Sequence, residues 1–195
     1  MLRAMMAAHP LATLVTHGTG GLNASLLPFS LVIEDGQPDR LRAHLARAND
    51  QLADLRAGAE AMVIFQGPQA YITPNWYPTK AEHGKVVPTW NYIVVQARGT
   101  PSVIEDAEWL REQIDALTAQ QEQMQAEPWT VEDAPAPFID ALLKAIVGIE
   151  IPIERIEGKW KVSQNQPAIN RAGVVDGLRA ADPASAMADA VERAR

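Results

Sequence analysis

Residues 11–33, LATLVTHGTGGLNASLLPFSLVI, decide the class of fold that the sequence predicts. Leu11–His17 is rich in β-branched residues and is predicted to be a strand. Gly18–Gly21 is predicted to be a turn, after which Leu22–Ile33 returns as a second apolar strand. Pro28 lies inside this second run and has no backbone N–H to donate, so we expect a bulge or a sheet edge there.

The same signals recur through the first half of the chain. Residues 41–47 alternate, with apolar side chains on one face and Arg42 and His44 on the other. Further strands are predicted at Ala61–Gln66, Ala70–Thr73, Thr89–Arg98 and Ser102–Ile104, and short helices at 2–8 and Asp50–Ala57. Six or more strands with short turns indicate an antiparallel barrel rather than a parallel sheet with crossover helices.

The pattern becomes mainly helical after Glu105. Asp106 can cap a helix, and a second helix is expected to begin near Pro137 and to end at Gly148. The apolar stripe of the first helix is predicted to consist of Leu110, Ile114, Leu117 and Met124. One more strand at Ile149–Ile156 and two helices, Pro167–Ala181 and Pro183–Ala194, complete the prediction of an α+β, mainly antiparallel fold.

Composition and charge exclude several classes of protein. The chain has 195 residues, 47% of them hydrophobic, which suits one globular domain. It has no cysteine, which excludes disulfides and thiolate metal sites. A net charge of −7 has the wrong sign for coating nucleic acid or anionic lipid by bulk electrostatics. Without a run of ~18 apolar residues or a signal-like start, the cytoplasm is the expected compartment.

One stretch stands out for chemistry, YITPNWYPTKAEHGKVVPTWNYIVVQARG at residues 71–99. Aromatic, cationic and amide side chains crowd a segment that three prolines stiffen and that lies mostly between strands. Loops of this kind often carry function, and a planar ligand with a phosphate would suit these side chains. A rigid loop that closes the barrel or packs against a partner subunit explains the same composition, and residue types alone do not separate the two interpretations.

Two smaller clusters are weaker signals. Residues 44–49, HLARAN, place Arg47 at the end of a strand, where a guanidinium can bind phosphate in a forked geometry. Between Arg155 and Arg171, four basic residues face only Glu157, a local sum of +3. The simplest interpretation of this second cluster is a solvated face over Trp160.

Taken in order, these clusters resemble the PaiB-type FMN-binding negative transcriptional regulators. The matching segments are HPLATLVT at residues 9–16, HLARAN at 44–49, Tyr71–Asn91, IVG at 146–148 and EGKWKVSQN at 157–165. The run WYPTKAEHGKVVPTWN at residues 76–91 is long and specific.

The resemblance implies an FMN-binding split β-barrel related to the pyridoxamine-phosphate-oxidase-like flavoproteins, which usually form homodimers with FMN at the subunit interface. Residues 1–105 would form the split-barrel core, and residues 106–195 would add helices and a returning strand to the same domain. The resemblance also implies repression of genes. By it, Arg47 and Lys85 become candidates for the phosphate, Trp76 and Trp90 for walls of the isoalloxazine ring, and Ser25, Asn49, Thr89 and Asn91 for polar contacts. No catalytic residue and no metal ligand is predicted.

The sequence departs from the family pattern in three places. Met1 begins partway through the expected first helix, so the start is either misassigned or lacks a short segment. Leu26 replaces a histidine, and leucine can neither donate a hydrogen bond nor be protonated. The segment after Asn165 reads Gln166-Pro167 and Asn170-Arg171 instead of the family's Arg-Pro and Asp-Arg.

Three functions are consistent with these observations. The first is a dimeric, FMN-binding repressor that contacts DNA through a local basic patch of Arg155, Lys159, Lys161 and Arg171. The second is a flavin-dependent oxidoreductase of a small substrate. The third, which Leu26 suggests, is a split-barrel dimer that has lost its flavin.

Overall fold

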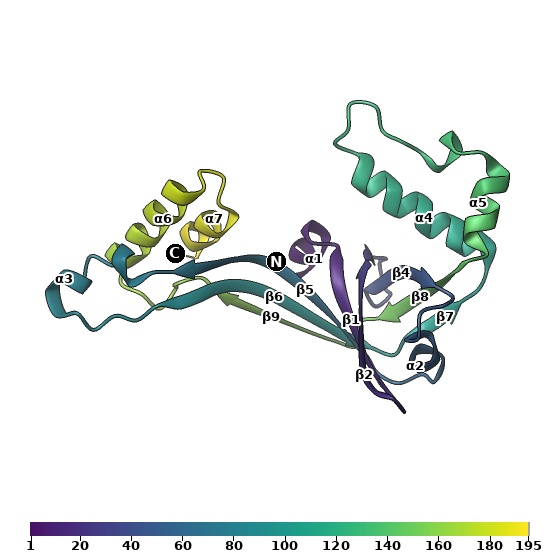
Figure 1. The fold of residues 1–195 in the computed structure, drawn as a ribbon, viewed down its shortest axis with the longest axis horizontal. Helices are drawn as coiled ribbons and strands as arrows, with labels where there is room; N and C mark the ends of the chain where they lie inside the picture. The colour runs from purple at the N-terminus through teal and green to yellow at the C-terminus, as the bar shows by residue number, and fades with distance from the viewer. Residues whose placement is uncertain (195) are drawn as a thin grey trace. The chain divides into compact units, whose positions relative to one another are not determined.

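The computed structural model describes residues 1–194, with its elements in the order drawn in Figure 1. The strands are β1 (Leu11–Gly18), β2 (Gly21–Pro28), β3 (Ser30–Val32), β4 (Arg40–Ala46), β5 (Ala61–Ile72), β6 (Thr89–Gly99), β7 (Ser102–Ile104), β8 (Ile146–Pro152) and β9 (Arg155–Lys161). The helices are α1 (Leu2–Ala8), α2 (Leu52–Arg56), α3 (Lys80–His83), α4 (Ala107–Glu122), α5 (Ala136–Leu143), α6 (Ala168–Ala181) and α7 (Ala186–Arg193). Two 3-10 turns are η1 (Pro74–Trp76) and η2 (Val131–Asp133).

The chain divides into two compact units. Unit 1 comprises residues 1–65 and 96–157, and unit 2 comprises residues 66–95 and 158–195. Each unit therefore takes segments from both sides of residue 105, where the sequence changes from strands to helices.

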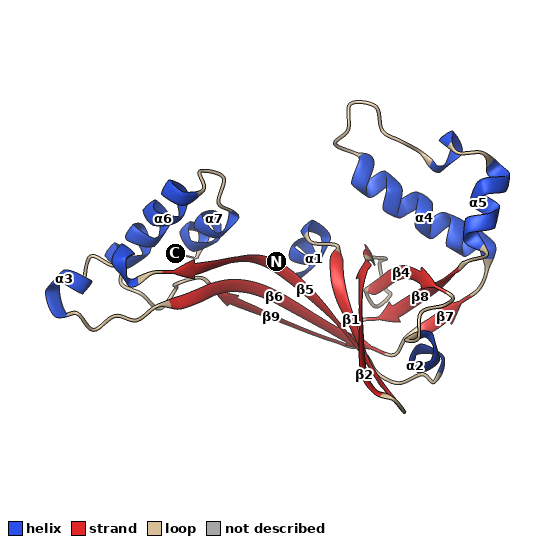
Figure 2. Ribbon diagram, in the orientation of Figure 1, coloured by secondary structure: helices blue, strands red, loops and turns tan. Residues whose placement is uncertain are grey.

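The strands form two sheets, with the orders β2-β1-β5-β6-β9 and β3-β4-β8-β7 (Figure 2). Strand β1 pairs with β2 and β5, β4 with β3 and β8, and β7 with β8. All of these pairings are antiparallel, which confirms the pairing direction predicted from the short turns.

The core of unit 1 is built on strands in which buried residues alternate with more exposed ones. Every second residue of β4 is buried, so the faces predicted for residues 41–47 are confirmed. Phe29 and Phe65 are 2% and 1% exposed and pack edge to face, with ring centroids 6.1 Å apart. Helix α4 begins as predicted, because the Asp106 carboxylate accepts a hydrogen bond from the backbone N–H of Trp109 at 2.8 Å.

Unit 2 contains its own helical layer. Buried side chains of α6 and α7 form this layer, among them Val174, Leu178, Met187 and Val191. Arg179 ties the two helices together, since its guanidinium donates to Glu192 at 2.8 Å and to Asp189 at 3.2 Å. Helix α7 begins at Ala186, three residues later than predicted, because the Ser185 side chain caps it by accepting from the N–H of Ala188.

Two predicted strand boundaries are wrong, both at prolines. Strand β2 ends at Pro28, and Ser30–Val32 joins the other sheet by pairing with β4; β2 is an edge strand, as Pro28 suggested. Strand β5 continues through Gly67 and Pro68, where two strands were predicted. Its register with β1 covers only Met62–Ile64, so Pro68 lies beyond that ladder, where no donor to β1 is needed.

Three predictions in the second half also need correction. Helix α4 ends at Glu122, so Met124 lies outside its stripe and is 87% exposed. The single strand predicted at Ile149–Ile156 is two strands, β8 and β9. Gly148 ends no helix; it lies inside β8 opposite His44.

The position of Gly148 yields a stability prediction. A Cβ atom on Gly148 would lie 2.2 Å from the Trp109 ring, so Gly148→Ala is expected to destabilise unit 1 by about 1–3 kcal/mol through overpacking. Urea unfolding of both proteins measures the difference. Gly20→Ala is the matched control, because nothing lies within 4 Å of a Cβ placed there. Equal losses in the two variants would contradict the packing argument.

Candidate functional site

A pocket of about 460 Å³ opens in unit 2. Its walls come from two segments that are far apart in sequence, residues 77–91 and 161–170. The lining includes two lysines, one histidine, several hydroxyls and five amide side chains, and no aspartate or glutamate. The volume lies within the usual range of small-molecule sites, roughly 300–1,000 Å³, and the lining favours an anion.

Three of the predicted flavin contacts, Lys85, Thr89 and Asn91, line this pocket. Thr89 accepts a hydrogen bond from Lys161 Nζ at 2.6 Å, and Asn91 Nδ2 donates to Ser163 Oγ at 2.9 Å. The sequence interpretation assigns no flavin contact to Lys161 or Ser163, because it favours a solvated face between Arg155 and Arg171 and places Lys161 in the predicted DNA patch.

The backbone at Ser163 is unusual. Its φ of 60° makes it the one non-glycine residue among 1–194 with a positive φ. Such left-handed conformations cost free energy and concentrate at functional sites. Gln164 holds the turn, since its side chain accepts from Val162 N at 2.9 Å and donates to Trp160 O at 2.7 Å.

Tyr77 is a buried part of the pocket wall. It is 3% exposed, and burial raises the pKa of its hydroxyl above the ordinary value. The phenol is therefore neutral at physiological pH and adds no negative charge to the lining.

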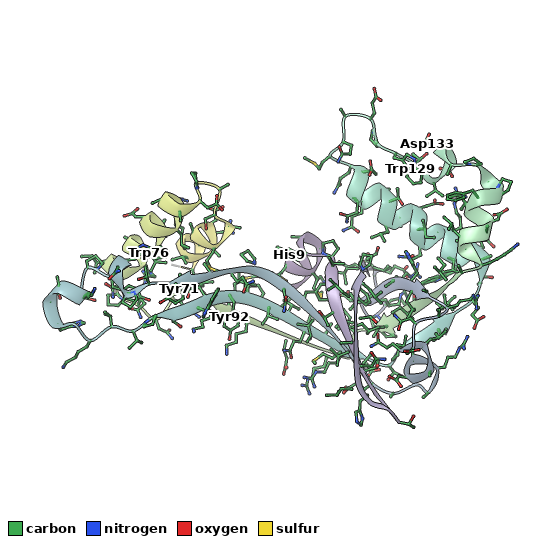
Figure 3. The ribbon with its side chains drawn as sticks, viewed as in Figure 1. His9, Tyr71, Trp76, Tyr92, Trp129 and Asp133 are labelled. Atoms are coloured by element: carbon green, nitrogen blue, oxygen red, sulfur yellow. The ribbon has the colours of Figure 1, made fainter. Side chains whose placement is uncertain are left out.

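The two predicted ring walls occupy different environments in unit 2. Trp76 is half-buried beside α6 (Figure 3), where a Cβ on Gly177 would lie 2.3 Å from its ring. Trp90 is 54% exposed and packs edge to face with Tyr71, at 5.8 Å between ring centroids. Tyr71 and Tyr92 come from the neighbouring strands β5 and β6 (Figure 3). Trp90 is thus the more accessible of the two indoles.

The remaining predicted contacts, Ser25, Asn49 and Arg47, lie in unit 1. Asn49 Nδ2 donates to Ser25 Oγ at 3.0 Å, and Asn49 Oδ1 accepts from the backbone N–H of Gln51 at 2.9 Å. Leu26, beside Ser25, is 61% exposed. These bonds fix the Asn49 side chain without any ligand.

Arg47 is already paired. Its guanidinium donates to Glu105 at 2.8 Å and to the carbonyl of Lys144 at 2.9 Å. The guanidiniums of Arg47 and Arg56 lower the pKa of Glu105 by hydrogen bonding. A phosphate would have to share Arg47 with this carboxylate, so its phosphate role stays a prediction.

The four residues of the predicted DNA patch have individual partners. Arg155 lies 3.5 Å from Glu157 in unit 1. In unit 2, the Nζ atoms of Lys159 and Lys161 lie 5.7 and 5.9 Å from the Tyr92 ring centroid. Arg171 donates to the carbonyl of Gln166 at 2.9 Å.

Charge divides sharply between the units. Unit 1 carries 19 acidic and 9 basic residues, a net charge of −10, whereas unit 2 carries 5 acidic and 8 basic residues, a net charge of +3. The net −7 of the chain therefore hides a positive unit.

Neither a metal centre nor a membrane span emerges from residues 1–194. No group of three or more histidine, aspartate or glutamate side chains there is placed to hold a metal ion. None of the helices in this range has the length and apolarity that crossing a membrane would require.

The antiparallel sheets and peripheral helices define an α+β protein of the split-barrel class, which confirms the predicted fold class. The family described as "Putative FMN-binding domain" matches residues 1–155, and the chain belongs to this family. FMN is accordingly its cofactor, as the resemblance implied.

Sequence relatives support the same assignment. The chain is 31% identical to the protease synthase and sporulation protein PAI 2 of Bacillus subtilis, over 86% of this chain and 77% of that protein. It is 36% identical to an uncharacterized protein of Emericella nidulans, over 80% of this chain and 75% of that protein. The chain is thus an FMN-binding protein of the PaiB type.

Solved structures share the fold at low sequence identity. A conserved hypothetical protein of Mycobacterium tuberculosis superposes with a TM-score of 0.59 at 16% identity, covering 85% of this chain and 86% of that one. The FAD and heme binding protein of Mycobacterium smegmatis gives a TM-score of 0.56 at 19% identity, covering 82% and 69%.

The residues present fit a phosphorylated flavin. Hydroxyl, amide and ammonium groups without a carboxylate line the unit 2 pocket, and this donor set suits a phosphate and polyol chain. Exposed Trp90 offers a face to a planar ring.

Proposed function

We propose that this FMN-binding protein acts as a cytoplasmic, homodimeric negative regulator of transcription. The observation that carries the proposal is the charge division: within a chain of net charge −7, unit 2 is positive. The relationship to the protease synthase and sporulation protein PAI 2 of Bacillus subtilis supports it further.

Unit 2 is the part suited to a nucleic-acid backbone. Among the described residues, none of the ion pairs involves Lys85, Lys159 or Lys161, so these ammonium groups are not neutralised by a carboxylate. Lys159 is exposed on β9, an edge strand. A dimer would carry two copies of these three lysines, which suits binding to the phosphates of a nucleic-acid backbone.

The proposed flavin contacts remain the eight residues named from the resemblance. They are Ser25, Arg47, Asn49, Trp76, Lys85, Thr89, Trp90 and Asn91. When bound, FMN supplies redox chemistry, and the protein supplies position and charge. The exposed aromatic pair of Tyr71 and Trp90 supports the dimer, because aromatic residues are enriched in protein interfaces.

The experiment measures DNA binding as a function of salt. We expect FMN-loaded protein to bind a labelled duplex from upstream of its own gene, losing about a thousandfold in affinity between ~50 and ~200 mM salt, as about six phosphate contacts require. Fluorescence anisotropy gives the affinities. Lys159→Glu is expected to weaken binding at every salt concentration, whereas Lys144→Glu, on an exposed residue of unit 1, is the matched control.

Sedimentation velocity on the same samples tests the dimer. The expected mass is twice that of the 21.2-kDa chain. If the protein does not bind the duplex at low salt, with or without FMN, the proposed role as a transcriptional regulator is refuted. A monomer at micromolar concentration would refute the homodimer.

A further inference from the structure

We propose that the unit 2 pocket binds the phosphate monoester of FMN, with Lys161 and Ser163 as principal ligands. This inference rests on the part of the proposed function that makes Lys85, Thr89 and Asn91 flavin contacts. It adds two residues that the resemblance did not assign and states which end of the cofactor they hold.

The hydrogen bonds inside the pocket leave donors without acceptors. Thr89 Oγ1 accepts from Lys161 Nζ, so its own O–H proton remains to be donated. Ser163 Oγ accepts from Asn91 Nδ2, so its proton is likewise available. The Lys161 ammonium has three N–H donors and gives one of them to Thr89. The hydroxyl oxygens of Thr89 and Ser163 therefore already accept hydrogen bonds from the pocket wall, whereas their protons and two Lys161 N–H groups remain free to donate. An anion with many acceptor oxygens needs this pattern.

The charge of the residues that line the pocket also favours a phosphate monoester. The pocket has no carboxylate among its lining residues, and Lys85 and Lys161 both contribute to it. A phosphate monoester carries three strong acceptor oxygens and close to two negative charges at neutral pH. Hydrogen bonds between charged partners are roughly twice as strong as neutral ones, so the ester matches this donor set better than a neutral polyol or ring.

The backbone holds this arrangement before a ligand arrives. Ser163 adopts its φ of 60° in a turn that the Gln164 side chain closes on both sides. Asn91, which bonds Ser163, is 1% exposed on β6. The two Gln164 hydrogen bonds hold the left-handed backbone, and prior positioning of the Ser163 hydroxyl at the pocket wall reduces the entropy lost on binding.

The test compares FMN with riboflavin, which lacks the phosphate. Quenching of flavin fluorescence gives both dissociation constants. Wild-type protein is expected to bind FMN at least 100-fold more tightly than riboflavin. Lys161→Met is expected to reduce this preference at least tenfold by weakening FMN alone, and Ser163→Ala to reduce it less. Lys161→Arg is expected to keep most of the preference, because it retains a cationic donor.

Lys80→Met is the matched control. Lys80 belongs to unit 2 and its Nζ donates to Asn75 Oδ1 at 2.7 Å, but it does not line the pocket. We expect it to bind both flavins as the wild type does. Thermal melts of each variant show whether it is folded, and inorganic phosphate as competitor is expected to displace FMN from wild type but not from Lys161→Met.

Several outcomes would overturn the inference. One is a wild-type protein that binds FMN and riboflavin equally. Another is a preference that survives in folded Lys161→Met. A third is inorganic phosphate that binds through Lys161 without displacing FMN, which would make the pocket a site for a separate phosphate. Loss of FMN in Asn49→Ala with an intact preference in Lys161→Met would place the phosphate in unit 1. Failure of DNA binding alone would refute the regulator and leave this inference standing.

Discussion

Phe65→Ala is expected to lower the free energy of unfolding by about 3–5 kcal/mol, among the largest effects of any single substitution in this chain. Phe65 is 1% exposed on β5 and packs edge to face against Phe29. Truncation removes the transfer free energy of the ring and leaves a cavity that the surrounding strands cannot fill by collapsing.

Chemical denaturation monitored by circular dichroism measures this loss. Phe138→Ala provides the control, because Phe138 belongs to the same unit and is 56% exposed. Its truncation should change stability by no more than about 0.5 kcal/mol. Similar midpoints for the two variants would mean that Phe65 does not anchor the core of unit 1.

Gln51→Leu is expected to lower the free energy of unfolding by about 2–4 kcal/mol. The Gln51 side chain is fully buried, and its Nε2 donates to the carbonyls of Leu14 and Asn23 and to Thr16 Oγ1, at 3.1–3.3 Å. Leucine has a similar size but leaves these buried acceptors without their donor.

Gln121→Leu, the same change at an exposed position of α4, is expected to be nearly neutral. Melting temperatures of both variants provide the readout. If Gln51→Leu melts like the wild type, the buried bonds of the Gln51 side chain contribute little to stability.

Local patterns predicted much of the fold. The alternation of Leu41, Ala43 and Leu45 identified a buried face. Asp106 identified the start of α4, because its capping hydrogen bond reaches a residue only three positions further along the chain. The antiparallel class follows from short turns between apolar runs. Such signals depend on neighbours in sequence, where periodicity and capping act.

The misplaced features depend on distant neighbours. Gly148 resembles a helix end in sequence, but the Trp109 ring, 39 positions away, requires the glycine. Pro68 resembles a strand break, yet β5 continues through it, since Pro68 lies beyond the register with β1 and needs no N–H donor to that strand. Neither partner can be deduced from the residues adjacent to these positions.

The candidate site shows the same contrast. Composition marked the stretch of residues 71–99, and the family resemblance singled out Lys85, Thr89 and Asn91 within it. A separate signal marked the basic residues around Lys161. That these two segments form one pocket depends on long-range pairing within unit 2, for which one sequence has no local pattern. The left-handed backbone of Ser163 was equally unforeseeable, because serine has no preference for it.

Because the segments of the two units are interleaved in the sequence, the units cannot fold in a simple order while the chain is being synthesised on the ribosome. The first segment of unit 2, residues 66–95, is synthesised long before the second, residues 158–195, and unit 1 is complete only at residue 157. Domains that are continuous in sequence can fold one after another as they emerge, at about 5–20 residues per second of synthesis. Here neither unit can do so. The strand residues among 66–95 lack their unit 2 partners until residues 158–195 are made, and during that period chaperones would find exposed binding sites.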